Sequence, residues 1–143
     1  MFFKTIKWDV TKDCFLNCRF CLNAEQRNKA KIEELDFEDI TSIIDKLNEL
    51  QVEHIQFLGG EPTYRKDFID ILVYIDKKTD IKVGFNTNGV KLNRNIIERL
   101  DSIKCLKSIY FSLDGTKNIH NKIRGANIYD KIIENISIAK KNW

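Results

Sequence analysis

The feature that most constrains the fold is a regular alternation of two kinds of apolar pattern. Short runs with apolar residues at alternate positions are typical of strands, and longer runs with a spacing of three or four are typical of helices. The short runs cover 6–10, 54–58, 81–85 and 106–113, and the longer runs cover 37–50, 68–75, 96–100 and 128–139. Strands that alternate with helices predict an α/β fold with a parallel sheet and right-handed crossovers.

Composition excludes two broad classes of protein. The 24 Lys and Arg against 21 Asp and Glu leave a net charge of +3, with no basic stripe of the kind that nucleic-acid-binding proteins carry. No run approaches the roughly 18–20 apolar residues that a membrane helix needs. An export signal is not expected, because Lys4, Lys7 and Asp9 interrupt the apolar start. A length of 143 residues is typical of one domain.

Each expected strand is followed by a segment with unusual residues. A cysteine-containing loop follows the first strand, and 59–62, 87–89 and 112–115 follow the other three. In parallel βα proteins, ligands bind at the carboxyl ends of the strands. These four segments therefore predict one site at that edge of the sheet.

Three of the four cysteines lie close together in the sequence. Cys14, Cys18 and Cys21 fall within eight residues, whereas Cys105 lies 84 residues further on. Three clustered cysteines cannot pair among themselves without one left over, unlike the cysteines of a secreted disulfide framework. This pattern favours a reducing cytoplasm. Clustered thiolates suit an iron–sulfur cluster or zinc. Cys105 and His54 begin their strands, roughly 17–20 Å from the opposite end, so neither is expected to be a fourth ligand. Two alternatives stay open: a four-iron cluster with one open iron, and zinc with an unidentified ligand.

The motif Cys14-x3-Cys18-x2-Cys21, with Phe20 before the last cysteine and the 59–62 segment Gly-Gly-Glu-Pro after the second strand, resembles the radical S-adenosylmethionine (radical SAM) enzymes. The resemblance covers nearly the whole chain. It implies that 1–143 is the N-terminal part of the core domain, a truncated (βα)4 portion of a partial TIM barrel with helices on the outer face, lacking strands five and six. This region would belong to an enzyme.

The later motifs narrow the resemblance. Thr-Asn-Gly at 87–89 and Ser-Leu-Asp-Gly at 112–115, followed by His120 and Arg124, are similar to those of peptide- and protein-modifying members. These members include sulfatase-maturing enzymes and the maturases of ribosomal peptides, which carry SPASM-type auxiliary domains. The resemblance therefore implies a peptide or protein substrate, and it implies no nucleic acid or membrane partner.

The resemblance also implies cofactors and their chemistry. Cys14, Cys18 and Cys21 would hold three irons of an oxygen-sensitive [4Fe–4S] cluster, and the fourth iron would chelate S-adenosylmethionine. One electron from an external donor of the flavodoxin or ferredoxin type would then yield methionine and a 5′-deoxyadenosyl radical, which abstracts hydrogen. The rival hypothesis is a non-catalytic iron–sulfur or S-adenosylmethionine-binding subunit, or a degenerate fragment that needs a partner chain.

Candidate cofactor-binding residues are assigned by the same resemblance. Glycines allow close backbone approach, a glutamate suits the α-amino group, an arginine suits the carboxylate, and the other polar groups suit the ribose or methionine. The residues are Phe20, Gly59, Gly60, Glu61, Asn86, Asn88, Ser112, Asp114 and Arg124. Asn-Gly and Asp-Gly are also frequent turn pairs. His120 and Cys105 are interpreted as structural, Cys105 as a small buried hydrophobe.

The length of the chain is short for the barrel that the resemblance implies. A full (β/α)8 barrel takes about 250 residues and a six-unit core would take about 210, whereas four units of about 35 use all of this chain. The strand at 106–113 is therefore expected to be an unpaired edge, with part of the inner apolar faces uncovered. We expect the isolated chain to form a homodimer, to need a second chain that completes the barrel, or to be a piece of a longer protein.

Overall fold

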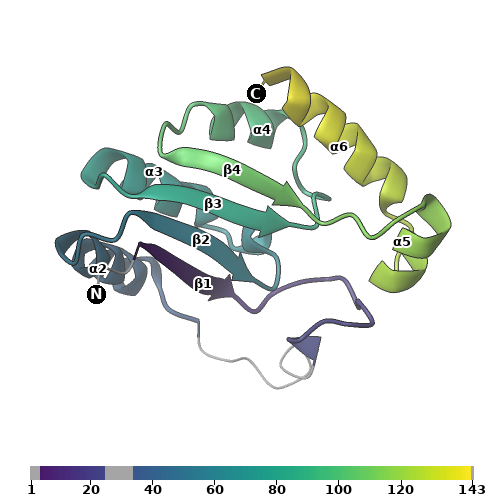
Figure 1. Ribbon diagram of the computed structural model, residues 1–143, viewed down its shortest axis with the longest axis horizontal. Helices are drawn as coiled ribbons and strands as arrows, with labels where there is room; N and C mark the ends of the chain where they lie inside the picture. Colours follow the sequence, from purple (N-terminus) through teal and green to yellow (C-terminus); the bar gives the residue numbers. More distant parts are fainter. Residues whose placement is uncertain (1–3, 25–33, 143) are drawn as a thin grey trace.

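Four parallel strands form a single sheet in the computed structural model, which describes residues 4–24 and 34–142. The strands are β1 (Thr5–Thr11), β2 (His54–Gly59), β3 (Lys82–Thr87) and β4 (Leu106–Phe111), and they lie side by side in that order. Figure 1 shows all four arrowheads at the same end of the sheet. The α/β fold and the parallel sheet are therefore confirmed.

Helices follow the strands in the expected alternation. They are α2 (Phe37–Glu49), η1 (Pro62–Tyr64, a short 3-10 helix), α3 (Phe68–Lys78), α4 (Arg94–Asp101), α5 (Lys117–Arg124) and α6 (Tyr129–Asn142). Asp36 caps α2 by accepting a hydrogen bond from the Asp39 backbone at 2.8 Å, which satisfies one of the unpaired amides of the first turn. Within residues 4–24 and 34–142, no helix combines the length and apolar character needed to cross a bilayer.

The apolar patterns did not predict α5. Only Ile119 and Ile123 are aliphatic in its eight residues, and one pair of residues four apart is too short a pattern to identify a helix. The helix ends where Gly125 adopts a left-handed conformation with φ of 68°, a common way to stop a helix. This short helix matters because it carries His120 and Arg124, which are both buried.

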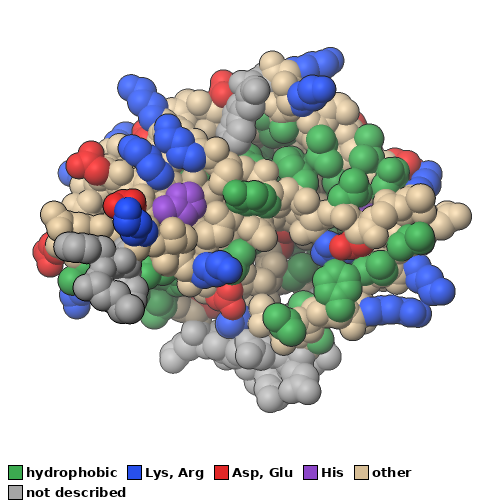
Figure 2. All heavy atoms as spheres, in the orientation of Figure 1, with side chains coloured by type: hydrophobic (Ala, Val, Ile, Leu, Met, Phe, Trp, Pro, Cys, Tyr) green, Lys and Arg blue, Asp and Glu red, His purple; other side chains and the backbone are tan. Residues whose placement is uncertain are grey.

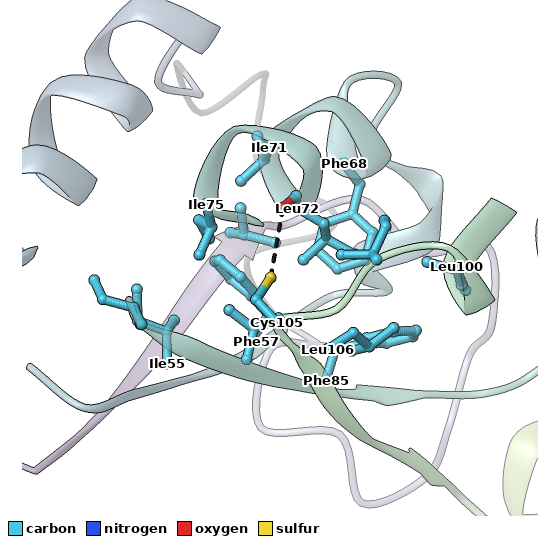
Figure 3. Packing of buried hydrophobic residues seen from close by; sticks show 14 of the residues in the cluster. Ile55, Phe57, Phe68, Ile71, Leu72, Ile75, Phe85, Leu100, Cys105 and Leu106 are labelled. Atoms are coloured by element: carbon cyan, nitrogen blue, oxygen red, sulfur yellow. Dashed lines mark hydrogen bonds between the residues drawn. The ribbon is translucent and has the colours of Figure 1, made fainter. Parts of the chain in front are cut away.

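One face of the sheet packs against helices and forms the main core. Phe68 of α3 makes edge-to-face contacts with Phe57 and Phe85 on neighbouring strands, at ring-centroid distances of 5.6 and 5.2 Å. Figure 3 shows these rings among the aliphatic side chains of α3. Phe57 and Phe85 are fully buried, so this face accounts for much of the apolar area removed from water.

The opposite face corrects one expectation. The strand register places Lys7 beside Gln56, Gln56 beside Gly84, and Asn86 beside Tyr110. This face is therefore mostly polar, and in the strands that the structure describes the expected uncovered inner apolar surface is reduced to a few side chains, Leu58 and Tyr110 among them. The reason is the alternation along the strands, which sends most apolar residues to the helix-covered face and most polar ones to the open face.

Exposed apolar side chains gather near the β4 edge of the sheet. Tyr110, Leu113, Ile119 and Ile133 are all exposed, and they belong to β4, the segment after it, α5 and α6. Figure 2 shows hydrophobic side chains gathered in this region of the open face. Among the described residues β4 pairs with β3 alone, so it is an edge of the sheet as expected. Association with another chain stays a prediction.

Candidate functional site

A cavity of about 630 Å³ lies at the carboxyl ends of the strands. It is lined by eleven of the residues that the sequence singled out, namely Cys14, Cys18, Phe20, Cys21, Gly59, Gly60, Glu61, Asn86, Asn88, Ser112 and Arg124. Asp114 is not among the residues that line this cavity, and its carboxylate pairs with Arg124. The segments after all four strands thus meet at one edge, as the placement rule for βα proteins predicts.

Two glycines allow the loop after β2 to contact the cysteine loop. The Gly60 amide donates to the Thr11 carbonyl and the Glu61 amide donates to the Asp13 carbonyl, both at 2.7 Å. A Cβ on Gly60 would lie 2.2 Å from the Asp13 carbonyl oxygen, and no such contact is tolerated. Gly59 has a φ of 128°, which an L side chain rarely adopts. Both glycines therefore fix the cysteine loop onto the sheet.

The three cysteines share one wall of the cavity. Cys18 is buried beside Leu16 and Ile132, whereas Cys14 and Cys21 are partly exposed at the edge of the same apolar group. Among the described residues, no three His, Cys, Asp or Glu side chains are gathered closely enough to hold a single metal ion. The three thiols therefore line the cavity without surrounding one common point.

Cys105 and His54 lie away from this wall. Cys105 is in the core, where its thiol donates to the Leu72 carbonyl at 3.7 Å (Figure 3). Burial, with a smaller contribution from Asp76, raises the pKa of Cys105 to about 12, so this thiol stays protonated. His54 is the first residue of β2, at the opposite end of the strand from the cavity. This placement agrees with the prediction that neither Cys105 nor His54 reaches the three cysteines as a fourth ligand.

Glu61 joins the ends of β2 and β3. Its Oε1 accepts from the Thr63 and Thr87 hydroxyls, both at 2.7 Å, and its Oε2 accepts from the Asn88 amide at 2.6 Å. The side chain is almost completely buried, and burial raises the pKa of this carboxyl group although the hydrogen bonds act to lower it. Glu61 therefore has a structural role at the edge of the cavity, and Oε2 keeps capacity for another donor.

Asn88 presents an unsatisfied donor at the cavity. Its Oδ1 accepts from the Val90 amide at 3.0 Å, which fixes the turn after β3. Its Nδ2 is buried and has no hydrogen-bond partner among the described residues. Buried polar groups are nearly always paired, so an unpaired amide in a cavity wall fits a bound ligand with an acceptor oxygen. Asn86 differs, since its Oδ1 accepts from Gln56 at 2.8 Å.

Arg124 brings a positive charge to the cysteine wall. Its Nε donates to one carboxylate oxygen of Asp114 at 2.6 Å and its Nη2 donates to the other at 3.1 Å. The remaining nitrogen, Nη1, lies 3.7 Å from the Cys18 sulfur. Burial acts to lower the pKa of Arg124, but Asp114 and then Cys18 outweigh it, so the pKa is raised and the guanidinium stays charged.

Sequence reasoning missed several lining residues, among them Asp9, Leu16, Leu58 and Thr87. Asp9 and Leu58 occupy paired positions on the open face of the sheet, so the alternation of β1 and β2 could have identified them. Thr87 was noticed as part of a motif but was not assigned to the site. Leu16 lies in an irregular loop, and no periodic signal marks it.

Comparison with known proteins identifies relatives of this chain. The family model described as the radical SAM superfamily matches residues 8–143. A mycofactocin maturase of Mycobacterium ulcerans is 33% identical over 138 residues, which are 94% of this chain and 36% of that protein. A 7,8-dihydro-6-hydroxymethylpterin dimethyltransferase of Methanocaldococcus jannaschii is 36% identical over 134 residues, 89% of this chain and 26% of that protein. The chain therefore spans about a third or less of the length of these relatives.

Solved structures share the fold. Streptococcus suis SuiB bound to its precursor peptide SuiA superposes with a TM-score of 0.82 at 20% identity, over 97% of this chain and 30% of SuiB. SuiB bound to S-adenosylmethionine superposes with a TM-score of 0.80 at 20% identity, over 96% of this chain and 31% of SuiB. At this level of identity the superposition establishes the architecture of the chain.

Proposed function

The chain belongs to the radical SAM superfamily, and we propose that it uses a [4Fe–4S] cluster to cleave S-adenosylmethionine reductively. The superfamily implies both cofactors, and the relatives named above are enzymes by their descriptions. One observation carries the proposal: Cys14, Cys18 and Cys21 share a cavity with the unpaired Asn88 amide and the charged Arg124. The thiols suit an iron–sulfur cluster. The unpaired amide donor and the cation suit a ligand that carries a carboxylate.

The residues of the chain would have distinct parts in this chemistry. Cys14, Cys18 and Cys21 would hold three irons, which leaves the fourth iron for S-adenosylmethionine. When bound, the reduced cluster supplies one electron to the sulfonium and generates methionine and a 5′-deoxyadenosyl radical. Asn88 would donate its unpaired amide hydrogen to an acceptor oxygen of S-adenosylmethionine. Glu61 would accept the α-amino group on Oε2, which has one protein donor, while Oε1 holds the two threonine hydroxyls.

The other predicted contacts complete the proposed cofactor site. Gly59 and Gly60 would keep the cysteine loop against the sheet, and Phe20 would cover the adenine side. Asn86 and Ser112 would contact the ribose or methionine portion. All five residues line the cavity, which supports this assignment.

We propose a peptide or protein as the substrate. The support is that SuiB was solved with its precursor peptide and that a maturase is among the relatives. The pterin dimethyltransferase shows that relatives of similar identity differ in what they act on, so substrate tests should include non-peptide compounds. The electron would come from an external donor of the flavodoxin or ferredoxin type. The proposed compartment is the reducing cytoplasm, because the clustered trio does not resemble a secreted disulfide framework.

The test is anaerobic reconstitution with iron and sulfide, followed by addition of S-adenosylmethionine and dithionite. We expect visible iron–sulfur absorption, equal iron and sulfide content, and 5′-deoxyadenosine measured by mass spectrometry. Cys18→Ala should lose the cluster, and Cys105→Ala is the matched control that should keep it. Zinc without visible absorption, or a folded and cluster-loaded chain that forms no 5′-deoxyadenosine, would refute the proposal.

A second candidate function is supported by length alone. The chain spans 36% of the mycofactocin maturase it matches, so cleavage could depend on a further chain or segment. In that case the protein is a cofactor-binding subunit. It would load a cluster and bind S-adenosylmethionine, yet form 5′-deoxyadenosine only after a partner polypeptide is added. A cluster-loaded chain that is active alone would exclude this alternative.

A further inference from the structure

The segment from Asp114 to Arg124 contains a chain of partly buried polar contacts that the proposed cofactor contacts do not explain. Both oxygens of Asp114 face Arg124, with 2.6 Å from Nε to Oδ2 and 3.1 Å from Nη2 to Oδ1. A two-point contact of this kind fixes the plane of the guanidinium as well as its position. With two nitrogens held, only Nη1 is directed to the Cys18 sulfur, at 3.7 Å.

His120 holds the other end of this chain. Its ring is fully buried and packs edge-to-face on Tyr129, with the ring centroids 5.8 Å apart. The Nδ1 atom accepts a hydrogen bond from the Asp114 backbone amide at 3.3 Å. Burial lowers the pKa of His120, and Arg124 lowers it further, while Asp114 acts to raise it. As the acceptor of this hydrogen bond, Nδ1 fixes the turn that carries Asp114, and it also lies 3.4 Å from Asp114 Oδ2. The Nε2 atom is buried and has no hydrogen-bond partner among the described residues.

We propose that Asp114 and His120 are positioning residues, which hold the Arg124 guanidinium against the Cys18 sulfur and thereby set the reduction potential of the cluster. This inference rests on the proposed function. The potentials of iron–sulfur clusters depend on net charge and on hydrogen bonds to the cysteine sulfurs. A fixed guanidinium supplies a positive charge and a hydrogen bond at the Cys18 sulfur. Both would favour the reduced state of the cluster. The guanidinium also lies over the Phe20 ring, with its central carbon 5.5 Å from the ring centroid.

The sign of one substitution separates positioning from direct charge. Asp114→Asn removes a negative charge near the cluster, and this change alone would make reduction easier. If Asp114 acts through Arg124, the same substitution releases the guanidinium from Cys18 and makes reduction harder. The two roles therefore predict shifts of the midpoint potential in opposite directions.

The first experiment measures midpoint potentials of the reconstituted chain by spectroscopic titration. Arg124→Gln and Asp114→Asn should each make reduction about tenfold less favourable, which is a shift of 59 mV for one electron. In the Arg124→Gln background, Asp114→Asn should no longer lower the potential. Asp130→Asn is the control, because Asp130 forms an exposed ion pair with Lys117 and should leave the potential unchanged. An unchanged or raised potential in Asp114→Asn would overturn the positioning role.

The second experiment needs no cluster, so its failure is distinguishable from failure of the proposed function. In the apoprotein, the Nε–H of Arg124 should give an exchange-protected NMR signal, which Arg124→Lys identifies by removing it. His120→Phe keeps an aromatic ring but lacks the acceptor, so protection should fall at least several-fold. His120→Asn places an acceptor near the position of Nδ1 and should restore it. Full protection in His120→Phe, or none in the wild type, would refute the chain of contacts.

Discussion

The helix-covered face of the sheet and its carboxyl edge bury different kinds of side chain. The covered face excludes water with side chains such as Phe57, Phe85 and Ile75, which are all fully buried and have no polar atoms. The carboxyl edge buries Glu61 and His120 almost as completely, but each of these must find specific partners. The first region depends on shape and area, and the second depends on direction and pairing.

This difference predicts how each region responds to change. Apolar burial is non-directional, so its loss should lower the free energy of unfolding without selectively altering the cavity. Buried hydrogen bonds contribute modestly to net stability, yet leaving one partner unpaired is unfavourable. We therefore expect the covered face to govern stability and the carboxyl edge to govern ligand binding. The substitutions below can break or sharpen this division.

The largest effect is expected from Phe85→Ala on the covered face. Phe85 is fully buried and contacts Phe68 at 5.2 Å, so its removal should leave a cavity and lower the free energy of unfolding by about 3–5 kcal/mol. Urea denaturation followed by circular dichroism measures this change. Leu50→Ala is the control, because Leu50 is mostly exposed and should change stability very little. A loss below about 1 kcal/mol for Phe85→Ala would contradict the assignment of this face as the main core.

A pair of glycine substitutions should separate the carboxyl edge, at Gly60, from the open face of the sheet, at Gly84. In Gly60→Ala the new methyl group would lie 2.2 Å from the rigid Asp13 carbonyl oxygen, so the cysteine loop must move. We expect a loss of about 1–3 kcal/mol, together with weaker cluster loading. In Gly84→Ala the near atoms are the side-chain ends of Ser108 and Gln56, at 2.4 and 2.5 Å, and these can rotate away.

Iron content after reconstitution and urea midpoints measure both glycine variants. Gly84→Ala should retain cluster loading, since its neighbours lie on the open face away from the cysteine loop. Equal loading in the two variants would mean that the close contact at Gly60 does not position the cysteines.

A smaller loss is expected where α6 supports the edge. Asn135 is fully buried, and its Nδ2 donates to the Gly89 carbonyl at 2.7 Å, so it fixes the turn that follows Asn88. Asn135→Ala should lower the free energy of unfolding by about 1–2 kcal/mol, because that buried carbonyl loses its donor. Urea denaturation checks stability, and calorimetry with S-adenosylmethionine checks whether affinity falls as well. Asn118→Ala, on exposed α5 surface, is the control. Unchanged stability in Asn135→Ala would argue against this support.

Much of the covered face could be predicted from the sequence. The alternation of apolar residues predicted β2 and α3 to within a few residues, because these elements bury one regular face. The helix α5 escaped this reasoning, since its burial is achieved by His120 and Arg124, whose polar side chains carry no periodic apolar signal. The same limit applies to Thr87, which is buried through a hydrogen bond to Glu61.

The sequence predicted which residues lie at the carboxyl edge better than it predicted which of their side chains contact one another. Strand order and loop position were enough to bring Glu61 and Asn88 to one cavity, because parallel strands end together, whereas Arg124 on α5 was suggested by the family resemblance alone. Pair contacts are different, since they depend on side-chain conformation across segments distant in sequence. The sequence suggested Asp114 as a cofactor contact, whereas the structure places both its oxygens on Arg124. Whether Asp114 also contacts a cofactor stays a prediction.

The smallest expected effect is a pH dependence that belongs to the carboxyl edge alone. Burial raises the pKa of Glu61 above its ordinary value of 4.5 in the folded chain. Between 4.5 and the raised pKa, the folded state therefore binds more protons than the unfolded state. The contribution of Glu61 to stability is then fully present below pH 4.5 and is lost as pH rises through the raised pKa. Glu61→Gln cannot titrate, so the advantage of the wild type over this variant should fall across that window.

Urea unfolding of both proteins from pH 4 to 8 measures the difference. Glu53→Gln provides the control, because Glu53 is exposed and pairs with Lys4 at 3.8 Å, in a surface ion pair of the kind that contributes little to stability, so it should not reproduce the change. An advantage that grows with pH would mean that the hydrogen bonds from Thr87 and Asn88 outweigh burial and hold the carboxylate ionised. Glu61 would then be a preformed anion at the cavity, and its proposed contact with a cationic amino group would not require a change in protonation.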